Sequence, residues 1–114
     1  MIYFDNAATT NVSKEALDAM LPYFTEIYGN PSSVYSLADA PKEAIAESRR
    51  KIAACFNCDA REIFFTASGS EADNWAVKGV CDTAAKIGKN KIITSAIEHH
   101  AVLTTCEYME KHGW

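Results

Sequence analysis

Four small residues form the stretch of this sequence best suited to bind a ligand: Ala67, Ser68, Gly69 and Ser70. They follow a short apolar run, 62–66, and precede a segment whose apolar residues recur at helical spacing. Small side chains let the backbone approach a ligand closely, and the first N–H groups of a helix point outward from the positive end of its dipole. We therefore expect an anion site here, for a phosphate or a carboxylate.

Two adjacent histidines, His99 and His100, suggest metal binding at first sight. They follow a second short run of β-branched residues, 91–95, and neighbouring side chains at the end of a strand point to opposite sides. The two rings are therefore not expected to ligate the same ion, and we predict no metal site. Taken alone, a histidine here is more often structural than functional, although imidazole can titrate near neutral pH.

Four cysteines offer thiol chemistry. Cys55 and Cys58 form a CxxC pair, which could be a redox pair or half of a zinc site. A redox pair is expected at a helix start, where the dipole lowers the thiol pKa, but this pair falls where a helical pattern ends. A zinc site needs a second ligand pair, and the sequence has no other CxxC and no HxxxH. Cys81 and Cys106 lie at helical core spacing and are interpreted as buried small apolar residues.

The elements that position these residues follow from the spacing of apolar side chains. Ser13 is a good N-cap, Pro22 predicts a bend or a local break within the first helical pattern, and Pro41 opens the next helix. The predicted helices cover 13–29, 41–57, the segment from the small-residue loop to about Gly88, and 101–111, and the predicted strands cover 62–66 and 91–95.

Strands that alternate with helices predict parallel βαβ units in an α/β sheet. Two strands are too few for such a sheet, because parallel strands are buried on both faces. We interpret the sequence as the opening part of a larger α/β protein. Helix faces that lack the rest of their sheet, such as the one with Leu17, Met20 and Phe24, predict self-association or marginal folding.

Composition narrows the function classes. The 114 residues suffice for one domain, and 48% hydrophobic with 23% charged residues is ordinary for a soluble globular protein. The net charge of −4 argues against binding to nucleic acid or a membrane surface. The basic run at 49–51 is interpreted as a solvated helix face. Without a signal peptide or a run of 18 apolar residues, we expect a cytoplasmic protein with free thiols.

Four motifs occur in a fixed order: YFDNAATT (3–10), GNPSS (29–33), EIFFTASGSEADNWAVKG (62–79) and IITSAIEHHAVLTTCEYMEKHGW (92–114). In this order and spacing they resemble the N-terminal part of the NifS/IscS-type cysteine desulfurases, class V enzymes of the fold-type I group that depends on pyridoxal 5'-phosphate (PLP). The resemblance covers essentially the whole sequence. It implies the opening portion of the large domain of a PLP-dependent transferase, with an N-terminal arm and helices and then βαβα of a mostly parallel sheet.

The resemblance also implies an activity and partners. The full-length enzyme would be a homodimer that takes sulfur from L-cysteine and leaves L-alanine and an enzyme persulfide. A sulfur-acceptor protein would then carry the sulfur toward iron–sulfur cluster or thiocofactor synthesis. Two alternatives stay open, a related class V enzyme such as a selenocysteine lyase or an aminotransferase, and a non-catalytic phosphate-binding or interaction module.

Site residues carry over by position. Gly69 and Ser70 match the pair that binds the PLP phosphate, and Ser70 keeps the hydroxyl of the usual threonine. His99 matches the catalytic histidine that stacks on the pyridine ring and is proposed to assist proton transfer. The arm near the substrate pocket is matched by Asn6, Ala7 and Ala8.

The match is not uniform along the sequence. Ser68 and Gly69 depart from the usual Gly-Ala order, and after GNPSS the family has a His and a Gly where this sequence has Tyr35 and Ala38. The Schiff-base lysine, the aspartate that pairs with the ring nitrogen and the sulfur-accepting cysteine lie downstream of everything matched. Lys78, eight residues after Ser70, is therefore interpreted as surface charge.

These assignments predict a division into an N-terminal arm (1–12), N-terminal helices (13–60) and an incomplete first βαβα part of the PLP-binding large domain (61–114). None of the four cysteines matches the nucleophile. We expect the 114 residues alone to have no desulfurase activity.

Overall fold

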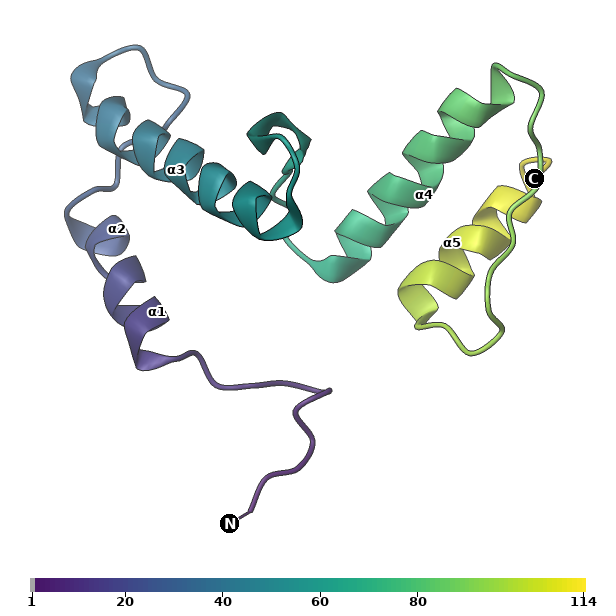
Figure 1. The fold of residues 1–114 in the computed structure, drawn as a ribbon, viewed down its shortest axis with the longest axis horizontal. Helices are drawn as coiled ribbons and strands as arrows, with labels where there is room; N and C mark the ends of the chain where they lie inside the picture. The colour runs from purple at the N-terminus through teal and green to yellow at the C-terminus, as the bar shows by residue number, and fades with distance from the viewer. Residues whose placement is uncertain (1) are drawn as a thin grey trace. The chain divides into compact units, whose positions relative to one another are not determined.

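The computed structural model describes residues 2–114, and the chain divides into two units at the peptide bond between Phe64 and Phe65 (Figure 1). The first unit contains α1 (Lys14–Met20), α2 (Pro22–Thr25), the 3₁₀ helix η1 (Ser36–Ala38), α3 (Asp39–Phe56) and the 3₁₀ helix η2 (Ala60–Glu62). The second unit contains α4 (Gly69–Ala85) and α5 (His100–Glu110).

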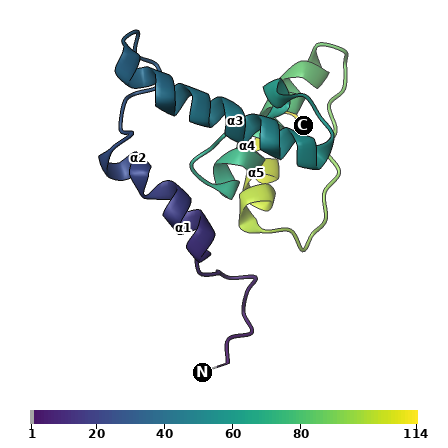
Figure 2. The same cartoon turned by 60° about the vertical axis from the view of Figure 1, so that its left-hand side comes forward.

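The helix start at Ser13 and the break at Pro22 are confirmed. The Ser13 hydroxyl oxygen accepts a hydrogen bond from the backbone N–H of Ala16 at 3.2 Å, which caps α1. Pro22 has no N–H to continue the hydrogen bonds of α1, so α1 ends at Met20 and α2 begins at Pro22 as a separate short helix (Figure 2).

Helix α3 ends as expected but begins earlier than predicted. It starts at Asp39, directly after η1, so Pro41 is its third residue and not its first. Proline fits there because the first N–H groups of a helix have no partner within it. At the other end Asn57 adopts the left-handed conformation, with φ of 52°, and closes the helix. Phe56, the last residue of α3, is 74% exposed.

The basic run 49–51 divides between two roles. Arg50 contacts the carboxylates of Glu43 at 2.5 Å and Glu47 at 2.7 Å, and these exposed pairs form the solvated face that we predicted. The hydrogen bond from Arg50 lowers the pKa of the Glu47 carboxyl. Arg49 is half-buried instead, and its Nε–H donates to the backbone carbonyl of Ile63 at 3.2 Å, which ties the segment after η2 to α3.

In the second unit α4 and α5 pack side by side and run in the same direction (Figure 1). Cys81 of α4 and Thr105 and Met109 of α5 are buried. Burial raises the pKa of the Cys81 thiol, and Cys106 beside it is half-buried. The Lys78 ammonium lies 4.7 Å from the centre of the Tyr108 ring across the helix pair, a cation–π contact.

The two predicted strands are not formed within residues 2–114. Glu62 closes η2, and 63–66 and 91–95 have no regular secondary structure. A strand is held by backbone hydrogen bonds to a neighbouring strand, and no such ladder joins these segments to another part of the described chain. The expected strand–helix–strand–helix order is therefore seen as two helices with irregular segments before and between them, and the sheet stays a prediction.

Much apolar surface is left open. The buried hydrophobic residues of the described chain are Ala38, Ala53, Cys81 and Met109, all small or flexible. By contrast, Phe24 is 69% exposed and Ile93 is 98% exposed. Large apolar areas of this kind are usually covered by other protein. None of the helices in the described part of the chain is long and apolar enough to cross a membrane.

Gly29 is expected to tolerate no side chain. A Cβ added there would press into the backbone carbonyl of Leu37, which cannot move as a side chain end can. We expect Gly29→Ala to lower the free energy of unfolding by about 1–3 kcal/mol, the usual cost of overpacking, in urea unfolding followed by circular dichroism.

Gly79→Ala is the matched control. Its Cβ would meet nothing within 4 Å, in the middle of α4, so we expect a gain of about 0.5–1 kcal/mol from helix propensity. If Gly29→Ala unfolds at the same urea concentration as the wild type, the close approach of Leu37 is wrong.

Candidate functional site

The small-residue loop turns directly into α4. Ser68 has extended backbone angles, with φ of −162° and ψ of 162°, and is the N-cap of the helix. Its hydroxyl oxygen accepts a hydrogen bond from the backbone N–H of Glu71 at 3.2 Å, while the Thr66 hydroxyl donates to the Ser68 carbonyl at 3.0 Å. Gly69 and Ser70 are therefore the first two residues of α4 and not part of a loop before it.

The capping side chains occupy some N–H groups of this turn and leave others free. The Glu71 carboxylate accepts a hydrogen bond from the Ala67 N–H at 2.7 Å, so the N–H groups of Ala67 and Glu71 both have partners. The consecutive N–H groups of Ser68, Gly69 and Ser70 make no hydrogen bond within residues 2–114. Free N–H groups at the start of a helix are the donors that bind an anion.

The free donors face open space. Ser68, Gly69 and Ser70 are all exposed, and a Cβ added at Gly69 would meet nothing within 4 Å. The Ser70 hydroxyl makes no hydrogen bond in the described chain and adds a side-chain donor to the backbone ones. The Ser70 carbonyl accepts from the Asn74 side-chain amide at 3.0 Å, on the side toward the helix. The turn can therefore take an anion without any rearrangement of its own hydrogen bonds.

His99 begins α5 in the way that Ser68 begins α4. It is the N-cap residue, and its ring nitrogen Nδ1 accepts a hydrogen bond from the backbone N–H of Ala101 at 3.1 Å. The ring of His100 lies edge-on to that of His99, with centroids 6.3 Å apart. Nowhere in residues 2–114 do three or more His, Cys, Asp or Glu side chains gather in a way that could hold a metal ion.

The direction of the two helices brings the predicted cofactor residues to one end of the second unit. Because α4 and α5 run in the same direction, their N-termini lie at the same end of the helix pair (Figure 1). Gly69 and Ser70 stand at one N-terminus and His99 at the other. The structure therefore gathers three of the predicted site residues, which come from segments about 30 positions apart in the sequence.

The predicted arm residues belong to the first unit and form a turn. The Ala8 N–H donates to the Asp5 carbonyl at 3.0 Å, so Asn6, Ala7 and Ala8 reverse the chain instead of extending it. The Tyr3 hydroxyl lies within hydrogen-bond distance of two carbonyls, 2.6 Å from that of Asp5 and 3.1 Å from that of Thr9. Sequence reasoning missed this role of Tyr3, because a single aromatic residue carries no periodic signal.

Lys78 and the CxxC pair lie outside this arrangement. Lys78 is half-buried over Tyr108, so its interpretation as plain surface charge is corrected to a packing contact. Cys55 is exposed in the last turn of α3, and Cys58 is half-buried just beyond the helix end. Both positions agree with a pair at a helix C-terminus, where the dipole gives a thiolate no support.

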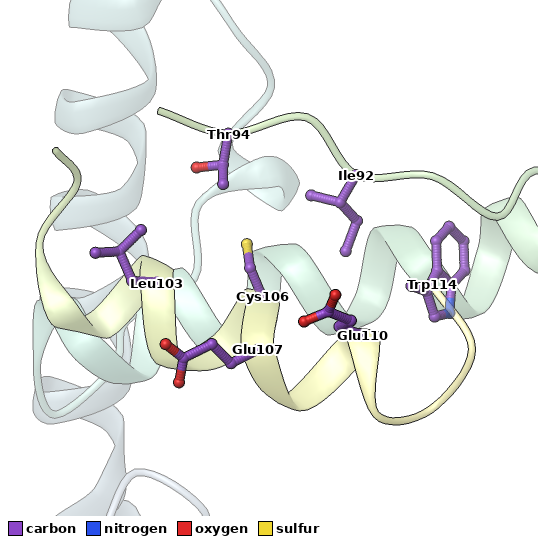
Figure 3. Close-up of a pocket in the computed structure, with 7 residues that line it drawn as sticks. All are labelled: Ile92, Thr94, Leu103, Cys106, Glu107, Glu110 and Trp114. Carbon is purple, nitrogen blue, oxygen red and sulfur yellow. The ribbon is translucent and has the colours of Figure 1, made fainter. Parts of the chain in front are cut away.

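A groove of about 290 Å³ runs between α5 and the segment that precedes it (Figure 3). Ile92 and Thr94 line one side and Leu103 and Cys106 the other, with the Cys106 sulfur directed toward the groove. The remaining lining residues are Glu107, Glu110 and Trp114. None of the predicted site residues lines this groove.

The chain matches the family model described as aminotransferase class-V over residues 2–114. It belongs to this family. A cysteine desulfurase IscS from Clostridium botulinum (strain Hall) and one from Methanosarcina thermophila are each 50% identical over 113 residues. Each match covers 99% of this chain and 28% of the relative. The class V chain therefore spans little more than a quarter of the length of these curated relatives.

Solved structures agree with this membership. A NifS-like protein superposes with a TM-score of 0.92 at 39% identity, covering 99% of this chain and 31% of that one. A structure described as SspA in complex with cysteine superposes with a TM-score of 0.89 at 38% identity, covering 98% of this chain and 32% of that one. The backbone of this class V chain is therefore similar to the matching part of these two solved structures.

Ser68 and Ser70 are expected to differ in their effect on stability. Ser68→Ala removes the cap of α4, so we expect a loss of about 1 kcal/mol in the free energy of unfolding. Ser70→Ala removes a hydroxyl without a partner and should change stability by less than about 0.5 kcal/mol. Urea unfolding of both variants without ligand tests this, and equal losses would mean that the cap is misassigned.

Proposed function

We propose that these residues form the cofactor-phosphate end of a PLP-dependent cysteine desulfurase, which takes sulfur from L-cysteine and leaves L-alanine and an enzyme persulfide. One observation carries the proposal. The free N–H groups of Gly69 and Ser70 and the ring of His99 lie at one end of the α4–α5 pair, in a chain that is 50% identical to proteins named cysteine desulfurase. The SspA structure with cysteine supports L-cysteine as the substrate.

The donor set fits the phosphate of PLP. A phosphate group offers three acceptor oxygens, and this turn offers three backbone N–H groups and the Ser70 hydroxyl as donors. The positive end of the α4 dipole lies behind them and favours the negative charge of the phosphate. Bound PLP would supply an electron sink for the bonds at the substrate Cα.

The residues of this chain would hold and orient the cofactor. Gly69 and Ser70 would bind its phosphate, and the flat ring of His99 would stack on the pyridine ring. The turn of the arm at Asn6, Ala7 and Ala8 would border the substrate pocket. Its exposed position in the first unit leaves it available for that role.

Other parts of the machinery would come from residues outside these 114. They comprise the lysine that holds PLP, the aspartate on the ring nitrogen and the cysteine that accepts sulfur. A homodimer and a sulfur-acceptor protein complete the proposal. In the same protein, 62–66 and 91–95 would be strands of the mostly parallel sheet of the large domain (61–114), after an arm (1–12) and N-terminal helices (13–60). The exposed Ile93 supports this, because a parallel sheet is covered on both faces.

Ser70 allows a direct test in the protein purified at the natural length given by its gene. Ser70→Ala should weaken PLP binding about 10- to 100-fold, the usual effect of losing a hydrogen bond to a charged group. Ser70→Thr, which keeps the hydroxyl, should bind PLP like the wild type. Equilibrium titration followed by PLP absorbance measures both. With an added dithiol that reduces the enzyme persulfide, the wild type should release alanine and sulfide in equal amounts from L-cysteine.

The proposal fails if the natural-length protein binds PLP but yields no alanine from L-cysteine, or if Ser70→Ala and Ser70→Thr bind PLP equally. The 114 residues alone should produce no sulfide above a control without protein. Sustained turnover by these residues alone would contradict the assignment of the covalent chemistry to residues outside them.

A further inference from the structure

The hydrogen bond that caps α5 decides which nitrogen of His99 carries a proton. The backbone N–H of Ala101 can only donate, and it points at Nδ1 of His99 at 3.1 Å. Nδ1 must therefore present a lone pair. A neutral imidazole has one bare nitrogen and one N–H, so the proton of His99 lies on Nε2.

We propose that this cap fixes His99 as a neutral hydrogen-bond donor through Nε2, and that its ring can take up a second proton only by breaking the cap of α5. Nε2 already holds a proton, so an incoming one must bind Nδ1. There it would face the Ala101 N–H, and two donors cannot share one hydrogen bond.

Ionisable groups share this end of the helix pair with His99. Glu98 precedes His99 in sequence, and Glu71 and Asp73 are in the first turns of α4, where the Glu71 carboxylate already accepts the Ala67 N–H. The His100 ring lies edge-on to that of His99. The positive end of a helix dipole, as at the start of α5, disfavours a cation in general.

His112 provides an opposite case in the same unit. Its Nδ1 lies 2.7 Å from the Tyr108 carbonyl oxygen, which can only accept, so Nδ1 of His112 must carry a proton. The ring also stacks on Tyr108, with centroids 4.1 Å apart. The second unit therefore contains two histidines whose Nδ1 atoms are held in opposite protonation states by backbone groups.

The chemical consequence rests on the proposed function. With the cap intact, His99 can stack on a flat ring and donate a hydrogen bond through Nε2, but it cannot accept a proton at that atom. Proton uptake by His99 would therefore be coupled to loosening of the first turn of α5. The Ala101 N–H acts as the positioning group that sets this behaviour.

Nitrogen-15 NMR of the natural-length protein labelled at histidine tests the assignment without cofactor or turnover. At mildly alkaline pH we expect the His99 signal, identified by its loss in His99→Asn, to show an unprotonated Nδ1 and a protonated Nε2. The His112 signal should show the reverse. A proton on Nδ1 of His99, or a doubly protonated ring, overturns the proposal.

The Ala101 amide gives a second measurement. Its chemical shift should follow the titration of His99 on acidification, because protonation removes its acceptor. In His99→Asn the side-chain oxygen can still cap α5, so this titration should disappear while the helix remains. His100→Gln is the matched control and should keep the titration. An Ala101 shift that still titrates in His99→Asn would contradict the coupling.

The outcomes separate this inference from the proposed function. A protein that shows these spectra but yields no alanine from L-cysteine refutes the desulfurase proposal alone. An active desulfurase with a proton on Nδ1 of His99 refutes the tautomer alone.

Discussion

The candidate site depends on the packing of α4 against α5 in a common direction. If the helices ran in opposite directions, the free N–H groups of Gly69 and Ser70 would lie at the far end of the pair from His99. Few buried residues hold this arrangement in the described chain, chiefly Cys81 on one helix and Thr105 and Met109 on the other. The position of the site therefore depends on a small buried contact between the two helices. Small residues in this contact matter more for the helix packing than their size suggests.

Capping side chains determine which backbone N–H groups at the start of each helix have a hydrogen-bond partner. The Ser68 and Glu71 side chains accept the N–H groups of Glu71 and Ala67, and the three N–H groups between these two have no partner within residues 2–114. At α5 the N-cap is itself a titratable side chain, because the His99 ring accepts the hydrogen bond from the Ala101 N–H. N-capping by a side chain thus leaves N–H donors free at the start of α4 and fixes the protonation state of a titratable ring at the start of α5.

Local signals in the sequence were sufficient to predict helix boundaries where a single residue determines the backbone conformation. Ser13 as a cap, the break at Pro22 and the end of α3 at Asn57 all follow from side chains that act within one turn. The N–H groups of Gly69 and Ser70 that have no partner within residues 2–114 were predictable for the same reason, and their use as an anion site stays a prediction. The contacts of the Tyr3 hydroxyl with the Asp5 and Thr9 carbonyls and the protonation state of His99 were not predictable, because each depends on one specific contact geometry. The strands could not be confirmed, since pairing needs a second segment that residues 2–114 do not supply.

The irregular segment 91–95 also has a consequence for assembly. Its backbone groups make no hydrogen bonds to other segments of the described chain, and Ile93 within it is 98% exposed. An extended stretch with unpaired edges and an apolar side chain is a template for any other extended polypeptide. A neighbouring strand must therefore reach this segment before a second molecule does, and productive folding becomes a kinetic competition that concentration, temperature and chaperones can shift.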